Sequence, residues 1–197
     1  MFKRAAKISF WILLISGWII LSGFVTNYYD ELILENIEIN FINDNSQKFI
    51  TKSEVNSMLL LMGIVNNVSL KKEIQLASIE KKLLNHSAIR NAQVYFNNNG
   101  GLKVDITKRT PIARFVSSVF EKNFYMDMRG FLMPVSKNYV SRVPIFSGEI
   151  NFPERLDLNI LDSLHRTAIF QEIYKMSKLI NNDTFLKSQI VQIHINN

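Results

Sequence analysis

The chain has no cysteine among its 197 residues. It therefore forms no disulfide and offers neither thiolate metal ligands nor a thiol nucleophile. Glycine is also scarce, with 7 residues. None of them belongs to a Gly-rich phosphate loop or to a GxSxG nucleophile elbow. These absences exclude several enzyme classes and leave the stability of the fold to side-chain packing.

The excess of positive charge is modest once its location is considered. The formal net charge is +6, from 23 Lys and Arg against 17 Asp and Glu. Lys3, Arg4 and Lys7 precede the first acidic residue, Asp30, and without these three the balance is 20 basic residues to 17 acidic ones. No basic run exceeds a pair, so the sequence does not favour nucleic-acid binding.

A long uncharged stretch follows the first cations. Residues 8–25 read ISFWILLISGWIILSGFV, and at 1.5 Å per residue they form about 27 Å of helix, close to the thickness of a bilayer core. The flanking charges predict a cytoplasmic tail at 1–7, one transmembrane helix at 8–25 with its N-terminus inside, and a tether at 26–36. A cleaved signal peptide is the alternative, although its apolar region is usually shorter.

Residues 37–110 predict an α+β unit with two helices on one face of a three-stranded sheet. Strands are indicated by alternating apolar residues, and the first helix by a capping box of Thr51 with Glu54. The predicted order is β-α-α-β-β: a strand at 37–41, a helix from 51 to 63, an amphipathic helix ending at 84, and strands at 92–96 and 102–107.

Residues 111–197 predict a second, mixed β domain with one long helix. Strand patterns occur at 112–116, 124–126, 131–135 and 143–146, an apolar helical stripe runs from Leu161 to Ile180, and alternation returns at 191–195. Because this last strand has no further strand to cover its far edge, we expect the domain to be incomplete.

The sequence contains no constellation that predicts catalysis. The histidines His86, His165 and His194 lie on different predicted elements and lack metal-ligand spacing. Each is interpreted as a surface or half-buried side chain. Two carboxylate pairs are interpreted as solvated charges rather than acid-base groups: Glu149 with Glu154, and Asp157 with Asp162. We therefore predict a protein that is not an enzyme and has no cofactor and no metal.

Five stretches occur in a specific order along the chain: FITKSEV at 49–55, IEKKLLNHSAIRNAQVYF at 79–96, LKVDITKRTPIARF at 102–115, YMDMRGFLMP at 125–134 and VPIFSG at 143–148. Their order and spacing resemble those of the FtsQ/DivIB family of bacterial cell-division proteins. That family has an N-terminal anchor, a POTRA domain and a mixed β domain. The resemblance implies a POTRA-like domain at 37–110, followed by the β domain at 111–197 without the family's last strands.

The resemblance also implies a function. It suggests a bitopic scaffold in the cytoplasmic (inner) membrane, with periplasmic domains that join division proteins during septum formation. Its expected partners are coiled-coil proteins of the FtsB/DivIC and FtsL type. Two alternatives stay open, namely a membrane-tethered envelope enzyme acting on a cell-wall component and a POTRA-type module that binds polypeptides.

Sheet edges are the predicted partner sites, because an added strand gains backbone hydrogen bonds there. The predicted edges lie near residues 102–107 or 37–41 in the first unit and at the last strand, 189–195. The predicted contact residues are Lys103, Asp105, Thr107, Gln192 and His194. The basic KRT run at 108–110 is interpreted either as a solvated strand end or as a further partner contact.

Overall fold

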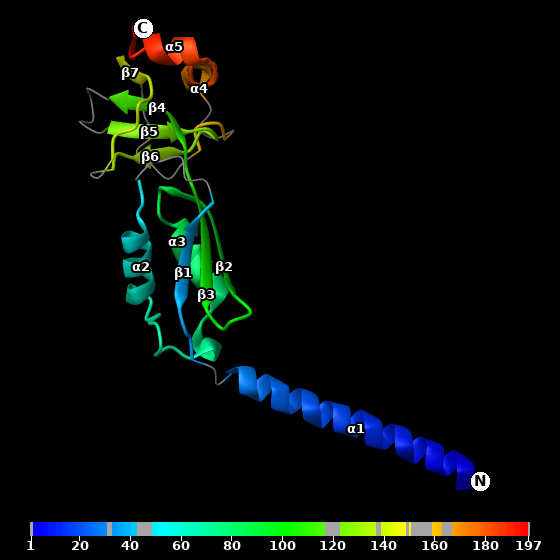
Figure 1. Cartoon of the computed structure of the whole chain (residues 1–197). Helices are drawn as coiled ribbons and strands as arrows, with labels where there is room; N and C mark the ends of the chain where they lie inside the picture. Colours follow the sequence, from blue (N-terminus) through cyan, green and yellow to red (C-terminus); the bar gives the residue numbers. More distant parts are fainter. Residues whose placement is uncertain are drawn as a thin grey trace.

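A computed structural model describes residues 2–30, 33–42, 49–116, 123–136, 139–148, 150, 159–162 and 167–196. The chain is an α+β protein in which one N-terminal helix precedes two sheets with their own helices (Figure 1). This agrees with the predicted fold class beyond the N-terminal segment.

The N-terminal helix α1 (Phe2–Asp30) is 29 residues long and extends away from the first sheet (Figure 1). Considering only the described residues, no helix of the chain combines the length and the apolar character needed to cross a membrane. The predicted span at 8–25 includes Ile8, Phe24 and Val25, whose side chains lie outside the description.

The first domain has the predicted β-α-α-β-β order, with one additional 3-10 turn. The central strand β3 pairs in parallel with β1 and antiparallel with β2, giving the order β1-β3-β2. The elements are β1 (Ile37–Phe41), α2 (Lys52–Leu61), η1 (Lys71–Glu73), α3 (Leu76–Leu84), β2 (Ile89–Phe96) and β3 (Leu102–Lys108).

Alternation along β3 explains why both helices lie on one face of this sheet. Leu102, Val104 and Ile106 are fully buried, whereas the residues between them are partly exposed. The predicted capping box also forms: the Glu54 N–H donates to Thr51 Oγ1 at 3.2 Å, and the Thr51 N–H donates to Glu54 Oε2 at 2.8 Å. These bonds satisfy amides that have no partner within the first turn of α2.

The second domain has a mixed five-stranded sheet in the order β6-β5-β4-β7-β8. Strands β4, β5 and β6 pair antiparallel, whereas β7 pairs in parallel with both β4 and β8. Its elements are β4 (Pro111–Val116), β5 (Asn123–Asp127), β6 (Leu132–Pro134), β7 (Ile145–Gly148), α4 (Ala168–Asn182), α5 (Thr184–Gln189) and β8 (Gln192–Ile195).

The predicted long helix is wrong at its start. Leu161 lies in a turn, where its N–H donates to Asn159 Oδ1 at 2.9 Å, and α4 begins only after the Thr167 cap. A second helix, α5, was missed. Asp183 ends α4 and caps α5 by accepting from the N–H groups of two following residues, so α5 begins beyond the predicted stripe, which ended at Ile180.

The two domains share a continuous apolar contact. The ring of Phe49, from the first domain, meets Tyr125 of β5 at 5.3 Å and Tyr139 at 5.0 Å, both edge to face. Tyr125 and Met133 belong to the same buried cluster as the first domain's core. The domains are therefore joined by side-chain packing as well as by the short link between β3 and β4.

Candidate functional site

The predicted edge at 102–107 is wrong, because β3 is the central strand of its sheet and pairs on both sides. Strand addition cannot occur along a strand whose backbone groups are already paired. The edges of the first sheet are β1, as the alternative prediction stated, and β2. Lys103, Asp105 and Thr107 remain predicted contact residues, but only through their side chains.

Those side chains lie on the sheet face opposite the helices, in a polar cluster. The Tyr95 hydroxyl donates to Asp105 Oδ2 at 2.9 Å, and Asn40 Nδ2 donates to Asp105 Oδ1 at 3.3 Å. The bond to Asp105 raises the pKa of Tyr95, and the charges of Tyr95 and Glu38 raise the pKa of Lys103. The cluster is solvent-exposed and joins all three strands through side chains.

The last strand, β8, is a sheet edge, as the sequence predicted. It pairs with β7 alone among the described strands. The Ile145 N–H donates to the Val191 carbonyl at 2.9 Å, so residue 191 directs its backbone groups toward β7. Because successive residues of a strand alternate, the backbone N–H and C=O groups of Gln192 and His194 point to the free edge.

The side chains of Gln192 and His194 lie on the surface beside Ser147 of β7. Gln192 Nε2 donates to Ser147 Oγ at 3.0 Å, and His194 Nδ1 lies 3.0 Å from the same oxygen. The structure therefore brings these two predicted residues together, whereas Lys103, Asp105 and Thr107 belong to the sheet of the other domain.

Exposed apolar side chains occur on the elements next to this edge. Phe185 of α5 and Val191 are each 69% exposed, and Leu179 of α4 is 63% exposed. Sequence reasoning placed Val191 in the predicted last strand, but it assigned no role to Leu179 or Phe185. Phe185 and Val191 lie beyond the predicted helical stripe, which ended at Ile180, so that stripe gave no signal for them.

An ion pair at the domain junction was also missed. Arg109 Nη1 donates to Asp127 Oδ2 at 2.8 Å, and the N–H groups of Arg129 and Phe131 donate to Asp127 Oδ1 at 2.8 and 2.9 Å. The Arg109 guanidinium also lies 4.3 Å from the centre of the Phe131 ring. The interpretation of KRT as a solvated strand end is therefore wrong at Arg109, which joins two stretches that are 18 residues apart in sequence.

Of the four candidate acid-base carboxylates, the structure describes only Asp162, so neither predicted carboxylate pair is tested. Among the described residues, no group of three His, Asp or Glu residues could hold a metal ion. His86 lies beside a pocket of about 290 Å³ between the domains, and burial lowers its pKa against the opposing charge of Glu54. His165, Glu149, Glu154 and Asp157 lie outside the described residues.

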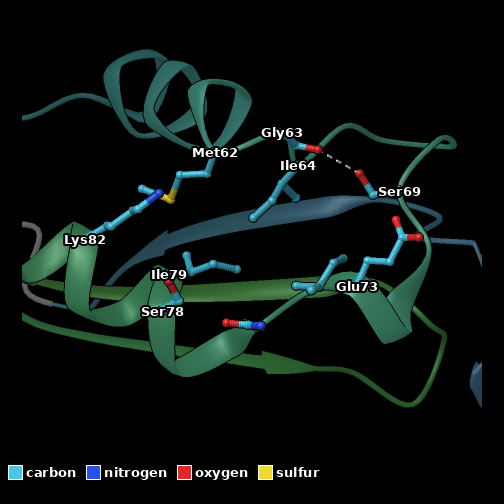
Figure 2. Close-up of a pocket in the computed structure, with 10 residues that line it drawn as sticks. Met62, Gly63, Ile64, Ser69, Glu73, Ser78, Ile79 and Lys82 are labelled. Atoms are coloured by element: carbon cyan, nitrogen blue, oxygen red, sulfur yellow. Dashed lines mark hydrogen bonds between the residues drawn. The ribbon is translucent and has the colours of Figure 1, made fainter.

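A second pocket of about 210 Å³ lies between α2 and α3 in the first domain (Figure 2). Its lining includes Met62, Ile64 and Ile79 together with Glu73 and Lys82. The lining is thus part apolar and part charged, with Glu73 from η1 and Lys82 from α3. This arrangement suits solvent at the edge of the core better than a tight ligand site.

Comparison with known families assigns both domains. Residues 33–107 match the family described as POTRA-like domain, and residues 110–197 match the family described as FtsQ/DivIB, C-terminal related. The chain is an FtsQ/DivIB-type protein. Among curated proteins, no sequence matches it.

The FtsQ/DivIB assignment agrees with the division of the chain into two sheets. The POTRA-like match falls on the three-stranded sheet and the C-terminal match on the five-stranded one, and the two matches support a role in cell division. In this FtsQ/DivIB-type protein, the Arg109–Asp127 pair forms where the two family matches meet.

Proposed function

We propose that this FtsQ/DivIB-type chain is a non-enzymatic scaffold of the bacterial division machinery, which joins other division proteins during septum formation. The observation that carries the proposal is the edge of β8 that no other described strand covers, where the ladder positions of Gln192 and His194 face outward. An added strand would gain main-chain hydrogen bonds there, and exposed Val191 and Phe185 would supply apolar contacts. The proposed partners are coiled-coil division proteins of the FtsB/DivIC and FtsL type.

We further propose that residues 8–25 anchor the chain in the cytoplasmic membrane, with the N-terminus inside and both domains in the periplasm. Large apolar side chains of α1 from Phe10 to Leu21 are between 50% and 75% exposed. Such a surface is unfavourable in water and favourable in lipid. The hydroxyls of Ser16 and Ser22 donate to carbonyls of their own helix, as polar groups in a bilayer require.

The β8 edge is tested by removing backbone N–H donors on its outer side while the pairing of β8 to β7 is kept. Gln192→Pro and His194→Pro delete N–H groups that face the free edge, which an edge strand tolerates. We expect each variant to lose most of the capture of coiled-coil partners when the full chain is purified from membranes. Gln192→Ala and His194→Ala are the matched controls, because they keep the backbone donors and should retain capture.

The outcomes separate edge pairing from side-chain recognition. Loss in the alanine variants as well would indicate that the side chains, not the backbone edge, bind the partner. Full capture by both proline variants would exclude β8 as the partner site. Charge reversal at Lys103 and Asp105 then tests the polar face of the first sheet, which we propose as a second contact surface together with Thr107.

A further inference from the structure

The end of the first domain that adjoins α1 has an apolar surface. The C-terminal end of α2, η1 and the turn between β2 and β3 all lie at this end (Figure 1). Leu61, the last residue of α2, is 88% exposed, and Val68 is 69% exposed. Ile33 and Val65 are also exposed. We refer to Ile33, Leu61, Val65 and Val68 as the proximal patch.

The loop that carries Val65 and Val68 is held to the chain that leaves α1. The Asn67 N–H donates to the Leu34 carbonyl at 2.7 Å, and the Leu34 N–H donates to the Ser69 carbonyl at 2.9 Å. Ser69 Oγ donates to the Gly63 carbonyl at 3.1 Å, as Figure 2 shows, and accepts from the Val65 N–H at 2.9 Å. These bonds keep the loop compact while its valines face solvent.

The loops at this end carry no charge. Residues 63–70 read GIVNNVSL and residues 97–101 read NNNGG. The exposed charges beside these loops have both signs: Glu35, two residues after Ile33, and Lys72 and Glu73 of η1. The side chains of Glu35 and Lys71 also lie next to Gly100 in the 97–101 turn. Four exposed apolar side chains at one end of a domain are unusual for a face fully exposed to water, and the mixed charges beside them do not indicate an anionic or a cationic partner.

Chain length places this surface close to the proposed anchor. Only residues 31 and 32 separate the end of α1 from Ile33, and α1 contacts η1. If residues 8–25 fill the bilayer core, residues 26–30 add about 7 Å of helix, which is about the thickness of one headgroup layer. Ile33 and the loop bonded to Leu34 then begin at the lipid surface.

From these observations we infer that the proximal patch rests on the outer surface of the lipid bilayer, with Leu61 and Val68 inserted between the headgroups. This inference rests on the membrane anchor of the proposed function. It adds a second membrane contact, which fixes the tilt of the POTRA-like domain and hence the height of β8 above the membrane. Because the patch is apolar, the contact is insensitive to salt.

The test uses single cysteines, which the chain allows because it has none of its own. The full chain is reconstituted into phosphatidylcholine vesicles with an environment-sensitive fluorophore at one position, and quenching by spin-labelled lipid is measured. Leu61→Cys and Asn66→Cys report on the patch. Lys52→Cys, at the other end of α2, is the matched control, and Trp18→Cys reports on the anchor.

We expect strong quenching at position 18, quenching at 61 and 66 several-fold above that at 52, and no change at high salt. If position 18 is quenched but positions 61, 66 and 52 are all quenched equally weakly, the inference is overturned, whereas the proposed membrane anchor is supported. No quenching at 18 overturns the anchor itself. In a Leu61→Asn, Val68→Asn background, the label at 66 should lose most of its quenching, and unchanged quenching would exclude the apolar patch as the cause.

Discussion

At the scale of single residues, the Arg109–Asp127 pair has the clearest energetic consequence. Asp127 is 2% exposed, and its two oxygens accept from Arg109 and from two backbone N–H groups. We predict that Arg109→Ala lowers the free energy of unfolding by about 3–5 kcal/mol, because a buried carboxylate loses its counter-charge. Urea unfolding of the full chain in detergent measures the change.

The control for this prediction is Arg129→Ala. Arg129 donates to Asp127 through its backbone N–H, which alanine retains, and its side chain is exposed. We expect a change within about 0.5 kcal/mol. Equal effects at the two arginines would contradict the role given to the ion pair.

His86 makes the free energy of unfolding decrease as the pH is lowered. Burial lowers its pKa below the ordinary 6.5, and its Nδ1 accepts from the Ala88 N–H at 3.3 Å. The unfolded chain therefore binds a proton at higher pH than the folded chain does. The contribution of His86 to stability is complete above pH 6.5 and is lost as the pH falls through the lowered pKa.

We predict that His86→Asn flattens this dependence. Unfolding free energies of the two proteins are compared from about pH 7 to pH 5, the range in which histidine changes charge. The loss on acidification should be smaller in the variant than in the original chain. Parallel curves for the two proteins would show that other groups cause the acid-side loss.

At the scale of elements, the position of β8 depends on Gly148 of β7. This residue has φ of +115°, and a Cβ added there would collide with the backbone carbonyl of Ile195. We predict that Gly148→Ala displaces β8, raises amide hydrogen exchange along this strand and reduces partner capture. It should also lower the free energy of unfolding by about 1–3 kcal/mol.

Gly63→Ala is the matched control for this element. Gly63 also has positive φ, +80°, but a Cβ there would meet nothing within 4 Å. The Gly63→Ala variant should have a lower free energy of unfolding, through backbone strain alone, and should leave hydrogen exchange in β8 unchanged. Equal exchange in β8 for the two variants would contradict the steric role of Gly148.

The helices and strands show which structural features the sequence predicts correctly and which it does not. The Thr51–Glu54 capping box and the alternation along β3 determined a helix start and a strand face correctly, because both depend on neighbours within a few residues. The stripe from Leu161 to Ile180 predicted one helix too long. Its periodicity did not reveal that Leu161 lies in a turn, or that Thr167 and Asp183 cap the two ends of α4.

At the scale of the whole molecule, contact between the domains decides how the chain unfolds. Phe49 meets Tyr125 and Tyr139 edge to face. We predict that Phe49→Ala lowers the free energy of unfolding by about 3–5 kcal/mol and separates a single unfolding transition into two, because the domains lose their shared apolar contact. Urea unfolding followed by hydrogen exchange in both sheets measures this.

Phe115→Ala is the control, because Phe115 is buried within the second domain against Phe146 and Phe170. It should destabilise the chain by a similar amount without uncoupling the sheets. A single transition in Phe49→Ala would show that the β3–β4 link and the Arg109–Asp127 pair suffice to couple the domains.

The sequence by itself determined the uncharged N-terminal stretch, the β-α-α-β-β order and the strand character of 191–195. Each of these depends on local composition or short-range periodicity. Only the tertiary structure decided that β3 is central, that β8 pairs in parallel with β7, and that Arg109 pairs with Asp127. A strand with one buried face has the same alternating pattern at the centre and at the edge of a sheet, so the pattern does not encode which strands are its neighbours.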